Sequence, residues 1–442
     1  MDILRARTHR GVISAGCAAL ILLSACAERD EVLPGVREDI RSGEVVSAEA
    51  SNQERAIRLA AQTANPSWAQ APGTAAYRTT HPALSAAPQR IWSASIGEGD
   101  KRKQRITASP VVDAGLVFTL DSSSRVTGLT TSGQQVWTAN ILPPADSDGE
   151  ATGGGLAVQE GILYVSSGFG VLTAIDAKSG NIRWRQELDA TGSGTPLVSG
   201  GIVYLVAGDD TGWAINASDG RILWQIAGTP SPTNVLGAPA PVIASEFSVF
   251  AFGSGDVVAA FRRGGLRRWD ASVAGQRVGR SVSQITDVTG SPMVIGSRIV
   301  AGSNSGRTVA FDVATGERIW TLQEGAAGPV WPGGDSVFSV TDTGFLARID
   351  IGSGELVWTT RLPGFLKDKP RKRGAIVAHH GPVVAGGQVV IASNDGLLRF
   401  FNPESGALVR TVEVPNGATT APVVAGRTLY VVSTKGELHA FR

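Results

Sequence analysis

The chain contains 442 residues, carries a formal net charge of +1, and has charged side chains at 18% of its positions. A sequence this close to neutral lacks the chain-wide positive field that attracts nucleic acid, so no nucleic-acid partner is expected. Both cysteines, Cys17 and Cys26, lie near the N-terminus. No cysteine-based site is therefore expected in the rest of the sequence.

The first 25 residues have the features of a bacterial secretory signal. A basic region with three arginines precedes residues 11–23, which are mainly apolar but too few to predict a membrane span. The next residues, Leu23-Ser24-Ala25-Cys26, resemble a lipobox, in which signal peptidase cuts before the cysteine and its thiol receives a diacylglyceryl group. An ordinary signal peptide with a chance cysteine is the alternative. We predict residues 1–25 to be a lipoprotein signal peptide and Cys26 to be the lipidated residue.

Residues 26–64 are predicted to form a lipid-anchored polar tether. Two or three acyl chains on Cys26 would hold the protein durably on a bilayer, whereas a single chain binds only marginally. Ala27 replaces the Asp that typically retains such lipoproteins at the inner membrane, which favours the outer membrane, with the protein facing the periplasm. The mature protein would contain no thiol, which suits an oxidising compartment. Residues 52–63 are the one stretch with a helix-like pattern.

Residues 65–442 are predicted to form a single repeat domain. The motif Gly-x-x-x-Trp recurs roughly every 40–50 residues, which is the period of one propeller blade. The copies are Gly133–Trp137, Gly180–Trp184, Gly220–Trp224, Gly265–Trp269, Gly316–Trp320 and Gly354–Trp358. A further copy, Gly406–Arg410, keeps the glycine but has no tryptophan.

Each repeat reads as four short strands. The first strand follows a proline, as at Pro241-Val242-Ile243, and turns rich in Gly, Asp or Asn separate the later strands. Six proline-led copies are clear, and two weaker copies at 155–158 and 329–330 bring the total to eight. The last copy lacks its Trp strand, whereas residues 90–94 form a Trp strand with no blade before it. We therefore predict an all-β, eight-bladed β-propeller closed by an N-terminal strand that completes the last blade.

The repeated tryptophans are predicted to be structural, because large rings dominate burial between layers of this kind. They are Trp92, Trp137, Trp184, Trp224, Trp269, Trp320 and Trp358. The Asp and Asn residues that recur near the ends of third strands, such as Asp176 and Asn216, are predicted to form turns. No metal site is therefore expected.

No catalytic motif stands out in the sequence. Eight-bladed rings with Trp repeats resemble the pyrroloquinoline-quinone (PQQ) dehydrogenases, which stack the quinone between a tryptophan and a disulfide of adjacent cysteines. The ring of this chain contains no cysteine, so that site cannot be built. His379 and His380 are neighbours in one strand, where adjacent side chains point to opposite faces and cannot converge on zinc. We predict no enzyme activity and no cofactor, with a PQQ-dependent dehydrogenase or a degenerate relative as the alternative.

One local basic run extends from Lys367 to Arg373, in a loop between strands or blades. We interpret it as a solvated loop, with a contact to an anionic group or a protein as the alternative. The run lacks the interleaved aromatic residues that favour binding of single-stranded nucleic acid.

Three features together resemble one family. They are the lipobox at Leu23–Cys26, the eight Trp-type blades without cysteine, and the spacer Leu33-Pro34-Gly35-Val36-Arg37. They are similar to the BamB family, the propeller lipoproteins of the outer-membrane β-barrel assembly (BAM) machinery. The resemblance implies a non-catalytic periplasmic scaffold that binds the POTRA domains of the central barrel protein and assists the insertion of outer-membrane proteins. Other BAM lipoproteins and unfolded outer-membrane proteins are further implied partners.

The resemblance also implies a partner-binding surface in loops between blades near the middle of the chain. The matching segments are 233–236 and 283–287, where Val235 and Leu236 would supply apolar contact and Asp287 a charged or hydrogen-bonding contact. The sequence departs from the family pattern in both loops. Leu236 stands where a basic residue is expected, and the expected acidic pair is reduced to Asp287. Ordinary loop residues are the alternative at each position.

Overall fold

The computed structural model describes residues 44–46, 50–71, 73, 81–192, 194–231, 238–275 and 285–442, with residues 44–46 described by their backbone only. Contacts divide the chain into Met1–Ser42 and a compact unit, Gly43–Arg442. Every described residue belongs to the second unit. The predicted signal peptide and Cys26 lie outside the described residues.

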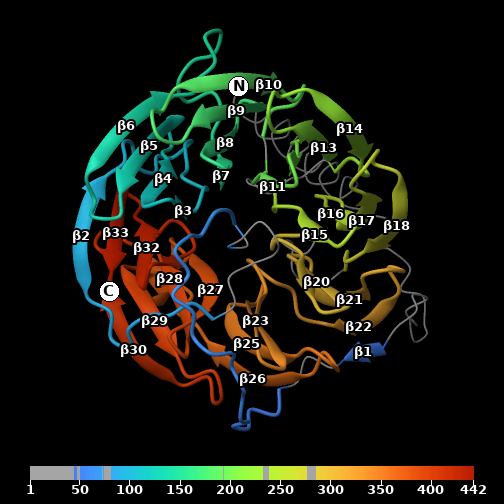
Figure 1. Cartoon of the computed structure of the whole chain (residues 1–442). Coiled ribbons are helices and arrows are strands. Elements are labelled where there is room, and N and C mark those ends of the chain that lie inside the picture. The colour runs from blue at the N-terminus through green and yellow to red at the C-terminus, as the bar shows by residue number, and fades with distance from the viewer. Residues whose placement is uncertain are drawn as a thin grey trace, which may run out of the picture. The chain divides into compact units, whose positions relative to one another are not determined.

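The compact unit is a ring of eight antiparallel sheets of four strands, one of which gains a fifth strand (Figure 1). This arrangement confirms the predicted all-β, eight-bladed propeller. The second and third strands of each blade are mostly buried, whereas fourth strands such as β10 (Ile182–Glu187) alternate between exposed and half-buried residues. The alternation places one face of each fourth strand against a neighbouring blade and the other face in solvent.

The first four blades follow in chain order. Blade 1 contains β3 (Val111–Asp113), β4 (Leu116–Leu120), β5 (Arg125–Thr130) and β6 (Gln135–Asn140). Blade 2 contains β7 (Gly154–Gln159), β8 (Ile162–Ser167), β9 (Val171–Asp176) and β10. Blade 3 contains β11 (Leu197–Ser199), β12 (Ile202–Val206), β13 (Thr211–Asn216) and β14 (Ile222–Ala227). Blade 4 contains β15 (Val242–Ala244), β16 (Phe247–Ala251), β17 (Asp256–Phe261) and β18 (Arg267–Ser272).

The remaining blades include the one that closes the ring. Blade 5 contains β19 (Met293–Ile295), β20 (Arg298–Ser303), β21 (Arg307–Asp312) and β22 (Arg318–Leu322). Blade 6 contains β23 (Trp331–Gly333), β24 (Ser336–Val340), β25 (Phe345–Asp350) and β26 (Leu356–Arg361). Blade 7 contains β27 (His379–Ala385), β28 (Gln388–Ser393), β29 (Leu397–Phe401) and β30 (Leu408–Glu413). Blade 8 contains β31 (Val423–Ala425), β32 (Thr428–Val432), β33 (Glu437–Phe441) and β2 (Arg90–Ser95).

Blade 8 joins the two ends of the ring, as predicted. β2 pairs antiparallel with β33, with Trp92 opposite Ala440, and forms the outer edge of the blade (Figure 1). The pairing continues where the strands end, because Gln89 and Arg442 exchange backbone hydrogen bonds of 2.7 and 2.9 Å. The closure leaves blade 8 without a loop between its third and fourth strands.

The repeated tryptophans, for which a structural role was predicted, lie at the junctions between blades. Each indole N–H donates to a backbone carbonyl of the next blade, at 2.9–3.2 Å. The donor–acceptor pairs are Trp92–Thr131, Trp137–Ala177, Trp184–Ala217, Trp224–Arg262, Trp269–Val313, Trp320–Ile351 and Trp358–Pro403.

The repeated glycines lie beneath these rings, which explains why glycine and tryptophan recur together. Gly133 has φ +87°, and a Cβ placed on it would lie 2.8 Å from the ring of Trp92 in the preceding blade. Equivalent close approaches join the six remaining pairs of glycine and tryptophan, through Gly406 under Trp358. Each Gly-x-x-x-Trp motif therefore places its glycine under the tryptophan ring of the preceding blade and its own tryptophan ring over the glycine of the next blade.

Arg410 occupies the tryptophan position at the junction between blades 7 and 8. β33 and β2 are paired in blade 8 but lie far apart in the sequence, so no short turn links them. The glycine turn that would receive a ring is therefore absent at this junction. The eighth tryptophan is therefore missing because the ring closes by pairing two distant segments, which leaves no glycine turn for a tryptophan ring to cover.

Residues 50–71 run along the ring instead of standing away from it. The predicted helix over 52–63 is wrong, because none of these residues is helical. The ring's contacts also begin before residue 65, where the tether was predicted to end. β1 (Glu44–Val46) pairs in parallel with β22, and the backbone N–H of Ser51 donates to the carbonyl of Leu356 at 3.4 Å. Bonds to the blades replace the bonds that a helix would make within itself.

A buried arginine holds this segment between blades 6 and 7. The side chain of Arg348 is fully buried and donates to the carbonyls of Arg55, at 2.5 Å, and of Ala56, at 3.2 Å. It also donates to Ser336 Oγ at 2.8 Å and pairs with Asp335 at 3.2 Å. Burial lowers the pKa of this guanidinium, and the hydrogen bond that it donates to Asp335 opposes the shift.

The segment then reaches the inner strands of the ring. Trp68 is 2% exposed, exchanges backbone bonds with Val112 of blade 1, and stacks on Trp331 of blade 6 with ring centroids 5.4 Å apart. Gln70 bridges to Val198 of blade 3, whose N–H donates to Gln70 Oε1 at 2.8 Å. We call residues 50–71 the strap, because they tie blades on different sides of the ring together.

Candidate docking face and central cavity

The connectors that lead from the fourth strand of one blade to the first strand of the next all lie at the same end of the ring. The antiparallel order of each blade places them there, together with the turns between second and third strands. We call this end the connector face. Of the two predicted partner loops, the described residues 285–287, which precede blade 5, belong to this face.

The predicted partner residues differ in how far the structure describes them. Val235 and Leu236 fall in 232–237, which lies outside the described residues. Asp287 is described, and it is only 5% exposed, so its side chain is not on an open surface. Its carbonyl accepts from the N–H of Asn304 at 3.1 Å, and the neighbouring Thr286 hydroxyl donates to the carbonyl of Gly253 at 3.0 Å. These bonds hold the second loop against the turns of blades 4 and 5.

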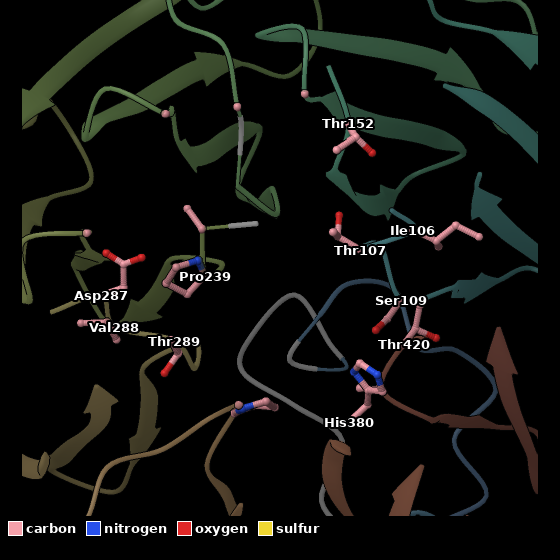
Figure 2. A pocket seen from close by; sticks show the side chains of 18 of the residues that line it. Ile106, Thr107, Ser109, Thr152, Pro239, Asp287, Val288, Thr289, His380 and Thr420 are labelled. Atoms are coloured by element: carbon pink, nitrogen blue, oxygen red, sulfur yellow. The ribbon is translucent and has the colours of Figure 1, made fainter. Parts of the chain in front are cut away.

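A cavity of about 670 Å³ lies at the centre of the connector face. Its walls come from residues just before the first strands of the blades, together with second-to-third-strand turns. Figure 2 shows Thr107 and Thr152 on one side of this space, Asp287, Val288 and Thr289 on another, and His380 near Thr420 on a third. The lining is dominated by small residues, which is what lets eight chain segments meet around one axis.

Asp210, an acidic group of the lining, is built into the fold. Asp210 is 3% exposed, and its carboxylate accepts from the backbone N–H of Gly253 at 2.8 Å and of Ser231 at 3.0 Å. Burial raises the pKa of this carboxyl, and the hydrogen bonds from Gly253 and Ser231 partly oppose the rise. The sequence indicated Asp210 only as part of a turn. The structure adds that it joins blade 3 to blade 4 across the cavity wall.

The two adjacent histidines have different surroundings, in line with their positions in one strand. His379 Nδ1 is 2.7 Å from Ser393 Oγ, and its Nε2 is 3.0 Å from the carbonyl oxygen of Pro363. His380 lines the cavity. Burial, with a smaller effect of His379, lowers the pKa of His380 to about 4, so this imidazole is neutral at neutral pH. His379 is therefore a structural link that also lines the cavity, whereas His380 is a neutral part of the cavity wall.

The cavity does not have the residues that PQQ would need. The quinone carries three carboxylates, which call for cationic partners, and its planar ring calls for a stacking surface. The described lining residues include no Lys, Arg, Trp or Cys. Across the described ranges, no cluster of three or more His, Cys, Asp or Glu residues is placed to hold a metal ion. The chemistry of the lining therefore does not fit this cofactor.

A family model described as "Outer membrane protein assembly factor BamB" matches residues 122–360 and 344–442. The chain belongs to the BamB family. BamB of Burkholderia pseudomallei (strain K96243) is 26% identical over 369 residues, which cover 80% of this chain and 88% of the relative. BamB of Escherichia coli (strain K12) is 26% identical over 363 residues, with the same coverage of both chains.

Solved structures show the same fold. The crystal structure of BamB from Moraxella catarrhalis has a TM-score of 0.67 at 20% identity, covering 80% of this chain and all of that chain. A quinohemoprotein alcohol dehydrogenase from Comamonas testosteroni has a TM-score of 0.62 at 15% identity, covering 86% of this chain and 81% of that chain. The dehydrogenase shares the ring, whereas the sequence relatives above are named assembly factors. No helix among the described residues is long and apolar enough to cross a membrane.

One part of the connector face was identified incompletely from the sequence. The basic run from Lys367 to Arg373 lies in the connector between blades 6 and 7, as a solvated loop would. The bulky apolar residues beside it, Phe365, Leu366 and Ile376, are also exposed, which was not predicted from the sequence. In the sequence, the position of these apolar residues next to the basic run was the one feature that could have indicated their exposure.

Proposed function

We propose that this member of the BamB family is a non-catalytic periplasmic scaffold of the outer-membrane BAM complex. It would bind the POTRA domains of the central barrel protein and assist the insertion of outer-membrane proteins. The observation that carries this proposal is the match of the assembly-factor family to residues 122–442, almost the whole ring. The curated relatives extend the similarity to 80% of the chain.

The docking surface would be the connector face around blades 3 to 5. The connectors that contain Val235, Leu236 and Asp287 are consecutive along the ring, so one partner domain could touch both. Apolar side chains at the first connector would supply the buried centre of such an interface. The 5% exposure of Asp287 favours a role in holding its loop, or a hydrogen bond at the cavity's rim, over a salt bridge in open solvent.

The membrane attachment would be through Cys26. Acylation at this residue would place the protein on the periplasmic face of the outer membrane, with Ala27 in the sorting position. Residues 27–42 would then be the link between the lipid and the compact unit, which begins at Gly43. This link is shorter than the predicted tether, because the strap belongs to the ring.

A pull-down from membranes tests the scaffold directly. The full-length tagged chain, extracted with detergent from its own host, should capture a large barrel protein with POTRA domains. Val235→Asp combined with Leu236→Asp should reduce that capture about tenfold or more, because charges at an apolar interface centre are desolvated without partners. Asp287→Asn should reduce it less.

The matched control is Leu266→Asp. Leu266 is 71% exposed and lies in the turn between β17 and β18, at the end of the ring opposite the connector face. This variant introduces a single Asp into an exposed apolar position and should leave capture unchanged. If the Val235/Leu236 variant captures the barrel protein as well as wild type does, the docking surface lies elsewhere. If wild type captures no POTRA protein, the scaffold proposal itself fails.

A further inference from the structure

The connector between blades 6 and 7 forms a hairpin of its own. Residues 363–376 are all exposed, and the hairpin is closed by backbone bonds from Leu366 N–H to the carbonyl of Ala375 and from Val377 N–H to that of Gly364, both 3.0 Å. A single 3₁₀ turn, η2 (Pro370–Lys372), lies between its two arms. The loop therefore has a defined shape without being packed against the blades.

The hairpin presents bulky apolar side chains to solvent. Ile376 is 69% exposed, Leu366 47% and Phe365 37%. Phe365 and Ile376 face each other across the two arms in an isolated bridge, so these two side chains belong to one small patch, and Leu366 lies beside it on the other face of its arm. The guanidinium of Arg373 lies over the ring of Phe365 at 5.4 Å. Exposed apolar patches held in place by local structure are typical of interaction sites.

The same hairpin concentrates positive charge. Residues 367–373 contain five basic residues and one acidic residue, a net charge of +4 in a chain whose total is +1. The rest of the chain therefore carries a net charge of −3. The one acidic residue, Asp368, pairs with Arg373 at 2.9 Å. No ion pair with another described residue is seen for Lys367, Lys369, Arg371 or Lys372.

We propose that this hairpin binds the surface of a membrane that contains anionic phospholipids. Lysine and arginine side chains would lie among the headgroups, and Phe365, Leu366 and Ile376 would enter the boundary with the acyl chains. The unpaired cations of the hairpin match the anionic headgroups of such a membrane, and its exposed bulky apolar groups match the acyl-chain boundary beneath them. An acidic protein partner would match the cations, but it would not account as directly for three apolar side chains among them.

The contact need only be weak to matter in the cell. A protein already tethered to a bilayer meets that surface at a high effective concentration, so a second weak contact can set its orientation. The hairpin would hold the connector face near the lipid surface, beside the site of barrel insertion. The contact itself depends neither on the anchor nor on docking to POTRA domains, so the two proposals can fail separately.

Residues 27–442 are suited to the test. This fragment contains the entire compact unit, Gly43–Arg442, and lacks both the lipid site and all cysteines. It should co-sediment with vesicles of phosphatidylethanolamine and phosphatidylglycerol, and much less with vesicles of phosphatidylcholine alone. High salt should weaken the binding to the anionic vesicles, because headgroup contacts are screened.

Charge and apolar variants separate the two parts of the contact. Arg371→Gln with Lys372→Gln should weaken binding to anionic vesicles at least tenfold, since each basic residue near such a surface contributes about fivefold. Ile376→Ser should weaken it severalfold. The matched controls are Arg263→Gln with Arg268→Gln, and Leu266→Ser, which change exposed residues of blade 4 and should leave binding unchanged.

A single cysteine reports whether the apolar tip enters the lipid. Ile376→Cys in this cysteine-free fragment, labelled with an environment-sensitive dye, should show a blue-shifted emission on anionic vesicles, whereas the same label at Leu266→Cys should not. The proposal is overturned if wild type does not prefer anionic vesicles, or if the hairpin variants bind as wild type does. Loss of POTRA capture in these variants, with vesicle binding unchanged, would assign the hairpin to a protein partner instead.

Discussion

The indole ring of Trp92 covers Gly133 of the neighbouring blade, so the strand that begins the ring is held by the first blade as well as by the last. The ring N–H donates to the carbonyl of Thr131 at 3.1 Å, and the glycine leaves room for the ring because it has no Cβ. This junction repeats through the propeller wherever a glycine turn follows a tryptophan strand. Substitutions at Gly316 and Trp320 test the contribution of this junction to stability.

Substituting alanine for Gly316 should destabilise the ring by roughly 2–4 kcal/mol. The residue has φ +74°, and a Cβ would lie 2.6 Å from Trp269, so backbone strain adds to overpacking. Thermal or urea unfolding measures the loss. Gly344→Ala is the matched control, because Gly344 has φ +84° with no atom near its Cβ position, and it should cost only about 1 kcal/mol. Equal losses in the two variants would contradict the role of the ring contact.

Trp320→Phe should lower the free energy of unfolding by roughly 1–3 kcal/mol. The tryptophan is 1% exposed, and its N–H donates to the carbonyl of Ile351 at 3.1 Å. Phenylalanine would leave that carbonyl without its donor and a void in the junction. Arg410→Phe at the junction without a tryptophan should change stability by less than about 1 kcal/mol. Chemical denaturation compares the two, and a larger effect at Arg410 would refute this account of the missing tryptophan.

Replacing Arg348 with Met should release the strap. The carbonyls of Arg55 and Ala56 would lose the guanidinium that they bond, and a buried network with one partner removed is costly, by roughly 2–4 kcal/mol. Brief trypsin digestion should then cleave the strap after Arg55 and Arg58 faster than in wild type. Arg221→Met, at a side chain that is 85% exposed, should leave cleavage unchanged. Protection of the strap in the Arg348 variant would show that other contacts hold it.

The stability of the ring should fall in mild acid, partly through His380. Its pKa is about 4 in the folded protein, because of burial and then His379, against about 6.5 in an unfolded chain. The unfolded state therefore binds more protons between these values, and stability is lost as pH falls from about 6.5 towards about 4. Burial also lowers the pKa of His379 and His439, which act in the same direction.

The variant His380→Gln isolates this contribution. Relative to wild type, it should gain roughly 1–2 kcal/mol in unfolding free energy between about pH 7 and about pH 5. His379 and His439 remain in both proteins, so their effects largely cancel in the comparison. Unfolding curves at both pH values provide the measurement. A pH-independent difference would mean that His380 is not held neutral by the cavity.

Adding PQQ and calcium to the purified protein should produce no saturable change in absorbance and no dye reduction with alcohols or sugars. The described cavity lining has no cation for the quinone's carboxylates and no aromatic ring other than imidazole on which it could stack. A PQQ dehydrogenase assayed in parallel shows that the reagents are active. Saturable binding or turnover would restore the enzyme alternative and count against a purely scaffolding role.

The outer strands and turns of the ring could be predicted closely from local residues. The Gly-x-x-x-Trp spacing indicated the propeller, the count of proline-led first strands gave eight blades, and the orphan Trp strand at residues 90–94 indicated how the ring closes. Even the weak copy at 155–158 became a full strand, β7. The strap could not be predicted in the same way. Its helix-like pattern is outweighed by bonds to Leu356 and Arg348, residues about 300 positions away in sequence.

The surroundings of the candidate site residues were harder to predict from the sequence than the fold. Asp287 was expected to be a contact residue, yet the structure buries it in the cavity wall, because the loop before β19 is bonded to turns of two blades. The basic run was recognised, but the exposure of Phe365, Leu366 and Ile376 depends on the path of the hairpin away from the ring. An apolar residue in a loop carries no local signal that distinguishes a buried position from an exposed one.

The sequence alone therefore determined the repeat, the closure and the absence of cysteine from the ring, because each follows from residue identity and spacing. Only the tertiary structure decided which side chains face the central cavity, how residues 50–71 bind across the blades, and which loop reaches into solvent. Those properties depend on where distant segments meet, and that is set by packing around the whole ring.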